Sequence, residues 1–204
     1  MSLDTHTVSE GERAVLVLAS ASPRRRELLQ QIGVNCLIQP VDICEDVLPG
    51  ERAEAYVARL ALEKAQAGLQ RSDADVALGS DTSVVLDDVI LGKPRDQAHA
   101  EEMLLALSGR RHQVMTSVAV VSDAAQEVRV VTTYVHFKEI TPATCSAYWN
   151  SGEPQDKAGA YGIQGLGAVF VEHIEGSYSA VVGLPLAETA EMLVQAGIPI
   201  WQRC

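Results

Sequence analysis

The stretch at residues 14–26, AVLVLASASPRRR, decides the fold of the first half of the chain. Its apolar run at 14–19 predicts a short buried strand. Ser22 followed by Pro23 then predicts the start of a helix, because serine is a favoured N-cap residue and proline fits the first helical turn. Gly33 predicts the end of this helix. A strand that leads directly into a helix is the repeating unit of α/β proteins, so we expect that fold class.

The same alternation continues along the chain and gives way to hairpins in the second half. Apolar residues at helical spacing predict helices at 53–70, 96–107, 142–149 and 185–196. Short apolar or β-branched runs predict strands at 36–43, 76–78, 84–86, 89–91, 112–122, 128–140 and 168–174. A loop rich in glycine is expected at 151–167. The pattern therefore predicts an α/β fold with a mixed sheet.

Composition and charge limit the class of protein. The chain has 204 residues, of which 47% are hydrophobic and 21% are charged, as is typical of a globular protein with a buried core. We expect a flexible polar leader at 1–13 and a single domain over 14–204. Its 16 Lys and Arg residues against 27 Asp and Glu residues give a net charge of −11. This charge disfavours binding to polymeric nucleic acid and to anionic membranes.

The sequence also indicates where the protein works. No apolar run approaches the roughly 18 residues of a membrane span, and the first residues lack the basic and apolar regions of a signal peptide. The four cysteines, Cys36, Cys44, Cys145 and Cys204, form no CxxC pair. We therefore expect a reduced, soluble protein of the cytoplasm.

The first candidate site is a run of cations at the predicted start of a helix. Arg24, Arg25 and Arg26 fall in its first turn, where the helix dipole already presents positive charge. Free backbone N–H groups and the hydroxyls of Ser20 and Ser22 accompany them, and this combination is typical of a phosphate-binding site. The alternative is that the arginines pair with surface carboxylates.

Two carboxylates are candidates for metal or water chemistry. Asp81 follows the predicted strand at 76–78, and Glu45 follows the predicted strand at 36–43. Ligands of open α/β sheets bind beyond the carboxyl ends of strands, so these two groups could share one hard cation. The alternatives are a turn-forming Asp81 and a solvated acidic loop around Glu45.

Three further side chains could contact a ligand. Lys64 lies on the apolar face of its predicted helix, and Lys93 follows a short strand, so either could reach a phosphate chain. For Lys64 the alternative is an ammonium that extends past the apolar face into solvent. Gln164 lies between glycines and offers both a donor and an acceptor, which suits the edge of a base. These glycines could instead serve only the turns of the loop.

Several segments occur in one order along the chain. They are Ser20-x-Ser22-Pro23-Arg24-Arg25, Glu45, Arg59-Leu60-Ala61-x-x-Lys64-Ala65, Gly79-x-Asp81-Thr82, Gly92-Lys93-Pro94-Arg95, Leu107-Ser108-Gly109 and DKAGAYGIQG at 156–165. In this order they resemble the Maf family of nucleoside triphosphate pyrophosphatases over about residues 14–196. The combination is far more specific than any one motif.

The resemblance implies a fold and an activity. The fold is the ITPase-like (Maf/Ham1-type) α/β architecture, a mixed β-sheet flanked by helices, with two lobes and a central cleft. The activity is hydrolysis of a nucleoside triphosphate to the monophosphate and pyrophosphate, with a divalent cation, Mg²⁺ or Mn²⁺, as cofactor. The expected role is house-cleaning of the nucleotide pool. The resemblance leaves open whether the protein forms a homodimer.

The resemblance also implies roles for individual residues. Asp81 is the expected catalytic carboxylate and, with Glu45, a metal ligand. The expected phosphate contacts are Ser20, Arg25, Lys64 and Lys93. The expected specificity positions are Arg24, Thr82 and Gln164, which resemble the type that prefers dTTP and UTP, with related modified pyrimidine triphosphates. The alternative is a non-hydrolysing nucleotide-binding regulator of cell division and septum formation, but a pure binding module would not need both Glu45 and Asp81.

Overall fold

The computed structural model describes residues 14–202, so the predicted leader at 1–13 lies outside the described part. These residues form one seven-stranded mixed sheet in the order β2-β1-β3-β5-β6-β7, with β4 paired to β3. The strands are β1 (Leu16–Leu18), β2 (Leu37–Ile38), β3 (Val76–Leu86), β4 (Val89–Leu91), β5 (Arg111–Ser122), β6 (Gln126–Phe137) and β7 (Val171–Glu175). The α/β class and the mixed sheet are confirmed.

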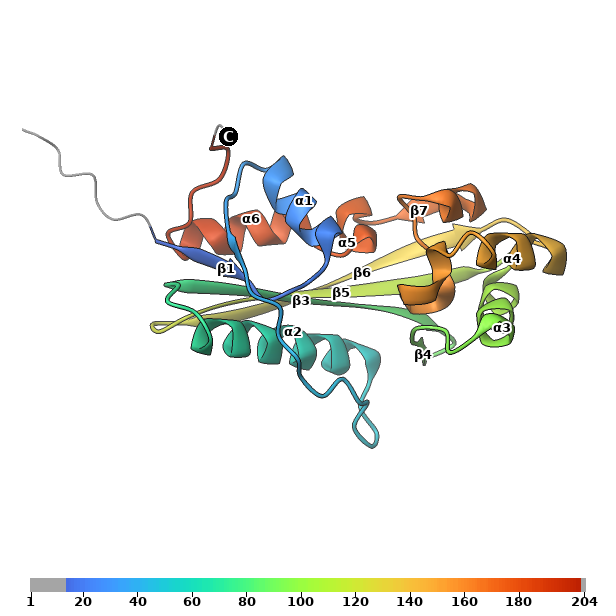
Figure 1. Ribbon diagram of the computed structural model, residues 1–204, viewed down its shortest axis with the longest axis horizontal. Helices are drawn as coiled ribbons and strands as arrows, with labels where there is room; N and C mark the ends of the chain where they lie inside the picture. The colour runs from blue at the N-terminus through green and yellow to red at the C-terminus, as the bar shows by residue number, and fades with distance from the viewer. Residues whose placement is uncertain (1–13, 203–204) are drawn as a thin grey trace, which may run out of the picture.

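Helices cover both faces of this sheet (Figure 1). They are α1 (Pro23–Gln31), α2 (Ala53–Gln70), α3 (Gln97–Leu107), α4 (Pro142–Trp149), α5 (Tyr178–Val182) and α6 (Leu186–Gln195). Figure 1 shows α1, α5 and α6 on one side of the long strands and α2 on the other, with α3 and α4 at the far end. Three short 3₁₀ helices, η1 (Glu153–Asp156), η2 (Ala158–Ala160) and η3 (Leu166–Phe170), replace most of the predicted glycine-rich loop. No helix of the described part is long and apolar enough to cross a membrane.

The N-terminal unit forms as the sequence predicts. β1 lies between β2 and β3 and is parallel to both. Ser22 takes the N-cap position of α1 with extended backbone angles, and Pro23 is the first helical residue. Gly33 follows the helix with φ +69°, a left-handed conformation that glycine adopts without strain. The chain then turns into β2.

Several strand predictions were wrong in length. The strand predicted at 168–174 begins only at Val171, because η3 takes up its first residues, and two others bear on the site. The strand predicted at 36–43 is reduced to Leu37–Ile38, so Glu45 lies in an irregular segment and not directly after a strand. The strand predicted at 76–78 continues without a break to Leu86, so Asp81 lies in mid-strand and the turn hypothesis is wrong. The physical reason is pairing with β5, in which Asp81 faces Ser117. This pairing supplies the backbone hydrogen bonds that a local turn would otherwise make.

The pairing along β3 has one interruption that matters for the site. β5 follows one edge of β3 along nearly its whole length. The other edge pairs with β1 at residues 76–78 and with β4 at 84–86. Among the described residues, no strand pairs with 79–83 on that edge. Asp81 and Thr82 lie in this interruption, and their side chains point to opposite faces because neighbours in a strand alternate.

The packing of α2 on β3 depends on Gly79. A Cβ atom there would lie 2.2 Å from the carbonyl oxygen of Ala61 and 2.5 Å from the amide nitrogen of Ala65. Glycine therefore lets the backbone of α2 approach the sheet closely. Because Lys64 is on the same helix, this close approach brings its side chain to the strand that carries Asp81.

Two hydrophobic clusters flank this part of the sheet. The cluster under α1 and α6 is aliphatic and includes Leu18, Leu29 and Leu193. The cluster next to α3 and α4 is rich in aromatic side chains that meet edge to face, including Phe137, Tyr148, Tyr161 and Phe170. The candidate site lies on β3 between the strand segments that enter these two clusters.

Candidate active site

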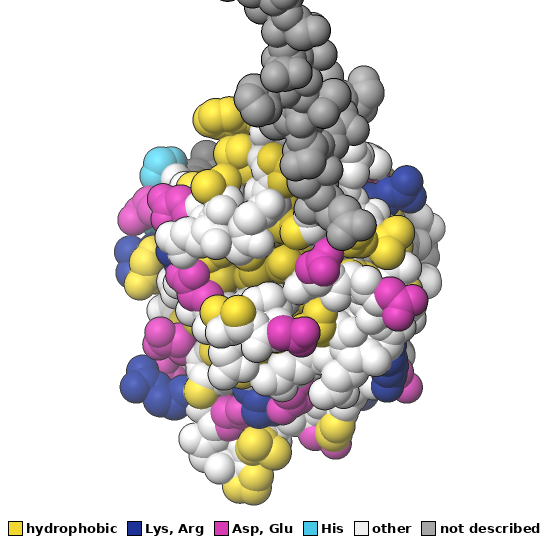
Figure 2. All heavy atoms as spheres, turned by 90° about the vertical axis from the view of Figure 1, so that its left-hand side faces the viewer, with side chains coloured by type: hydrophobic (Ala, Val, Ile, Leu, Met, Phe, Trp, Pro, Cys, Tyr) yellow, Lys and Arg dark blue, Asp and Glu magenta, His cyan; other side chains and the backbone are white. Residues whose placement is uncertain are grey.

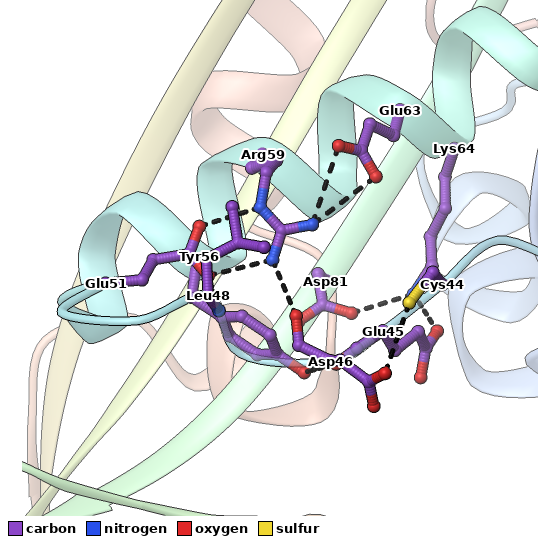
Figure 3. A network of polar contacts seen from close by, with 10 residues as sticks. All are labelled: Cys44, Glu45, Asp46, Leu48, Glu51, Tyr56, Arg59, Glu63, Lys64 and Asp81. Atoms are coloured by element: carbon purple, nitrogen blue, oxygen red, sulfur yellow. Dashed lines mark hydrogen bonds and ion pairs between the residues drawn. The ribbon is translucent and has the colours of Figure 1, made fainter.

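Lys64 joins the two predicted metal ligands. Its ammonium nitrogen donates a hydrogen bond to Oδ1 of Asp81 at 2.8 Å and lies 2.6 Å from Oε1 of Glu45. The Lys64 and Asp81 side chains are only 11% and 12% exposed, while that of Glu45 is 49% exposed. Figure 3 shows the three groups converging from α2, β3 and the loop before α2. The alternative of an exposed, unpaired Lys64 is therefore wrong.

Arg25 approaches β3 from the helix that follows β1. Its Nε donates to the carbonyl oxygen of Gly183 at 2.9 Å, and its Nη1 donates to Oγ of Ser20 at 3.2 Å. Its Nη2 donates to Oγ1 of Thr82 at 3.4 Å. Burial lowers the pKa of Arg25, and the charge of Asp81 opposes this effect. The Ser20 and Thr82 hydroxyls and the Gly183 carbonyl thus surround a half-buried guanidinium, and no carboxylate within residues 14–202 is hydrogen-bonded to it.

The cationic side chains of the site act on the carboxylate of Glu45. Burial alone would raise the pKa of Glu45, but the hydrogen bond and charge of Lys64, with the charges of Lys93 and Arg25, lower it below its ordinary value. Lys93 is exposed and forms no ion pair within the described residues. Lys64, Lys93 and Arg25 therefore surround the two carboxylates with positive charge, as a phosphate-binding site requires.

The two remaining predicted residues, Arg24 and Gln164, take no part in the contacts around Lys64 and Arg25. The hydrogen bond from Lys157 lowers the pKa of Asp156, and the charge of Arg24 lowers it further, so Arg24 lies near the glycine-rich segment. Gln164 is exposed and makes no hydrogen bond within residues 14–202. The structure does not bring Gln164 into contact with Asp81 or Arg25.

Glu153 holds the segment that carries Gln164, and sequence reasoning did not find it. Its Oε1 accepts hydrogen bonds from the Tyr148 hydroxyl at 2.7 Å and the Gly167 amide at 3.0 Å. Its Oε2 accepts one from the Leu166 amide at 2.7 Å. A Cβ on Gly165 would lie 2.1 Å from this oxygen. The glycines of the segment were the available signal, since they allow this carboxylate to approach the backbone.

The donor set fits a cation that arrives with its substrate. Among the described residues there is no group of three or more His, Cys, Asp and Glu side chains that could hold a metal. Glu45 and Asp81 each have one oxygen engaged by Lys64 and one that is not. Mg²⁺ is commonly held by one or two carboxylates together with substrate phosphates. These two residues fit that pattern.

An apolar hollow of about 360 Å³ lies elsewhere, next to β1 and the C-terminal end of the described chain. Figure 2 looks onto this end of the molecule and shows hydrophobic side chains exposed there. Its lining includes Leu16, Leu37 and Ile198, and the lining residues that the structure describes carry no charged side chain. The described lining offers a triphosphate no cation, whereas Arg25, Lys64 and Lys93 lie around Asp81 and Glu45, so Asp81 and its neighbours are the candidate site.

This chain is similar to known proteins over most of its length. A "dTTP/UTP pyrophosphatase" of Saccharophagus degradans is 51% identical over 99% of this chain and 98% of that protein. One of Vibrio parahaemolyticus is 58% identical over 87% of this chain and 95% of that protein. A solved HAM1 protein from Coxiella burnetii matches with a TM-score of 0.52 and 18% identity, over 89% of this chain and 99% of that one, which supports the expected fold alone. The model of the family described as "Maf-like protein" matches residues 15–196, and the chain therefore belongs to the Maf family.

Proposed function

We propose that this protein hydrolyses dTTP and UTP, with related modified pyrimidine triphosphates, to the monophosphate and pyrophosphate. The observation that carries the proposal is the contact of the Lys64 ammonium with both Asp81 and Glu45, near the half-buried guanidinium of Arg25. Relatives named dTTP/UTP pyrophosphatase, at 51% and 58% identity, support it. In the cell the protein would act in the cytoplasm and remove unwanted nucleotides from the pool.

Glu45 and Asp81 would hold a divalent cation, Mg²⁺ or Mn²⁺, together with the phosphate chain. When bound, such a cation supplies charge neutralisation and polarisation of a phosphoryl oxygen. The chain supplies its own cations as well, since Arg25, Lys64 and Lys93 lie around the same carboxylates. Their positive charge stabilises the negative charge that develops on the departing pyrophosphate.

Asp81 is the residue that accepts a proton. Lys64 engages Oδ1 of Asp81, which leaves Oδ2 to take a proton from the attacking water. The water oxygen forms a bond to the α-phosphorus, and the bond from that phosphorus to its bridging oxygen breaks. The products are the nucleoside monophosphate and pyrophosphate, and the proton from water remains on Asp81 until it is released to solvent.

Base selection is assigned to Arg24, Thr82 and Gln164. The hydroxyl oxygen of Thr82 accepts a hydrogen bond from Arg25 at 3.4 Å and lies 3.1 Å from that of Thr116, whose one hydrogen is donated to the carbonyl oxygen of Ala180 at 2.7 Å. The hydrogen of Thr82 is therefore donated to Thr116, and the second lone pair of the Thr82 oxygen would be left for a ligand donor such as the N–H group of a pyrimidine. The side-chain amide of Gln164 can donate to and accept from the edge of a pyrimidine, which presents two carbonyls around an N–H group.

The test is release of pyrophosphate by the purified protein from UTP, dTTP, ATP, GTP and 7-methyl-GTP, with and without Mg²⁺. We expect the highest kcat/KM for UTP and dTTP, and activity that depends on Mg²⁺. A preference for 7-methyl-GTP would contradict the assignment of the base. Tight binding of UTP without any turnover would instead support the non-hydrolysing regulator.

A further inference from the structure

The segment that carries Glu45 has no helix or strand of its own. Residues 44–50, between β2 and α2, are exposed and irregular. The Glu45 side chain is half exposed, and Lys64 is its ion-pair partner. One contact to a flexible ammonium fixes a carboxylate poorly. The position of Glu45 therefore depends on how the backbone of this segment is held.

Two side chains of α2 hold that backbone at neighbouring carbonyl groups. The Tyr56 hydroxyl donates to the carbonyl oxygen of Glu45 at 2.8 Å. Nη2 of Arg59 donates to the carbonyl oxygen of Asp46 at 3.0 Å. Residues three apart share one face of a helix, so α2 presents both side chains to the loop. Figure 3 shows them beside Glu45, on the helix that also carries Lys64.

Arg59 also fixes the far end of the loop through Glu51. Its Nε and Nη2 donate to the two oxygens of this carboxylate at 2.7 and 2.8 Å. The same carboxylate accepts the backbone amide of Leu48 at 3.0 Å. The Glu51 side chain is only 8% exposed. The hydrogen bond from Arg59 lowers the pKa of Glu51 to about 2, so the pair stays charged at neutral pH.

We propose that Arg59 and Tyr56 are positioning residues for hydrolysis. They hold the backbone at Glu45 and Asp46, and thereby place the Glu45 carboxylate against Lys64 and beside Asp81. This assignment rests on the proposed function, because it treats Glu45 as part of the end of the site that binds phosphate and cation. Arg59 acts on the reaction only through the loop.

The shape of the arginine side chain gives a way to separate this role from a general effect of charge. Arg59 uses a planar fork to hold Glu51 while a nitrogen of the same fork reaches Asp46. Lysine keeps the charge but has no fork. Arg59→Lys therefore preserves the net charge of the protein and removes the geometry. Glu63→Gln is the matched control, since Glu63 contacts Arg59 only at 3.5 Å and does not touch the loop.

The first measurement is amide hydrogen exchange of the protein without nucleotide or metal. Because about 1.4 kcal/mol corresponds to a factor of ten, loss of one or two of these hydrogen bonds should speed exchange of the two hydrogen-bonded amides of the loop, those of Leu48 and Glu51, roughly tenfold in Arg59→Lys. Tyr56→Phe should speed exchange of the same two amides by a smaller factor, because Tyr56 holds the loop at one carbonyl group only. Exchange within β3 and β5 should stay unchanged, and Glu63→Gln should match the wild type. Unchanged exchange at 44–51, or a rise throughout the protein, would overturn the proposal.

The second measurement is the dependence of UTP hydrolysis on Mg²⁺ concentration. Outer residues that orient a metal ligand affect metal affinity by about 10- to 100-fold, so Arg59→Lys should raise the half-saturating Mg²⁺ concentration about tenfold. The rate at saturating Mg²⁺ should change much less. In a Glu45→Gln background, Arg59→Lys should have almost no further effect, and full additivity would contradict the proposal. If the wild type does not hydrolyse UTP, the proposed function fails, while hydrogen exchange still tests how the loop is held.

Discussion

Asp81 and Glu45 contact the same ammonium, that of Lys64, but the chain holds them in different ways. Asp81 is buried in the middle of β3, where pairing with β5 fixes its backbone. Glu45 is half exposed on an irregular loop, and a few polar contacts from α2 hold it. The site thus combines one carboxylate fixed by the sheet with one fixed by side chains. We expect the first to determine the rate of the chemical step and the second to adjust cation binding.

Asp81→Asn should have the largest effect. The amide cannot accept a proton from water, and loss of general-base catalysis typically costs on the order of 10²-fold or more in kcat. Binding of UTP should be retained, because Arg25, Lys64 and Lys93 remain. The measurements are kcat for UTP and the dissociation constant of a non-hydrolysable UTP analogue. Near wild-type turnover would remove Asp81 from its assigned role.

Glu45→Gln should have a smaller effect of a different kind. The half-saturating Mg²⁺ concentration should rise by roughly 10-fold or more, because the cation loses one charged oxygen ligand. The value of kcat at saturating Mg²⁺ should fall far less than in Asp81→Asn. A Mg²⁺ titration of both variants under the same conditions compares the two carboxylates directly. Equal losses of kcat with unchanged Mg²⁺ dependence would show that the two carboxylates act alike.

Gln164→Glu tests whether the glycine-rich segment that carries Gln164 takes part in selecting the base, as the loop that carries Glu45 is expected to take part in binding the cation. A carboxylate would repel the carbonyl edge of a pyrimidine and attract the cationic 7-methylguanine. Changes in one exposed hydrogen bond are worth about 1 kcal/mol, so the ratio of kcat/KM between UTP and 7-methyl-GTP should narrow about fivefold. The maximal rate with UTP should change little. An unchanged ratio would separate Gln164 from base selection.

The smallest expected effect concerns acid stability. The folded-state pKa of Glu45 is lowered, so its contribution to stability is full above its unfolded-state pKa of about 4.3 and is lost as pH falls through the folded value. For a half-exposed pair the contribution is at most about 1 kcal/mol. Urea unfolding should show a gap between wild type and Glu45→Gln that shrinks below about pH 4. Exposed Glu139→Gln is the control, and a gap that widened on acidification would contradict the assignment.

Periodicity predicted the helices well and the strands unevenly. The limits of α2 and α4 were correct because apolar spacing and the Thr141–Pro142 start are local signals. The strands predicted at 84–86 and 89–91 do pair as a hairpin, and the two residues between them, Asp87 and Asp88, both have positive φ. The continuation of β3 through Asp81 could not be predicted locally, since it depends on pairing with a strand more than thirty residues later in the chain. The short helix α5 carried no periodic signal.

The sequence predicted which residues belong to the site but not how they contact one another. Sequence order and the family resemblance brought Asp81, Glu45, Lys64 and Arg25 onto one list, and the structure places all four together. The bridging role of Lys64 depends on how closely a helix approaches a sheet, which no local pattern contains. Arg59 stood in a quoted motif without a role, because its partners lie on a loop with no regular structure.

Gly79 leaves the chain little freedom to vary around this site. The atoms that a Cβ would meet, 2.2 Å away on Ala61 and 2.5 Å away on Ala65, belong to the backbone and cannot rotate aside. A larger residue at this position would push α2 off the sheet and would carry the Lys64 ammonium away from Asp81. A lineage could therefore keep every charged group of the site in its sequence and still lose the site. Whether Lys64 and Asp81 can form their ion pair therefore depends on Gly79, a residue that has no functional group of its own.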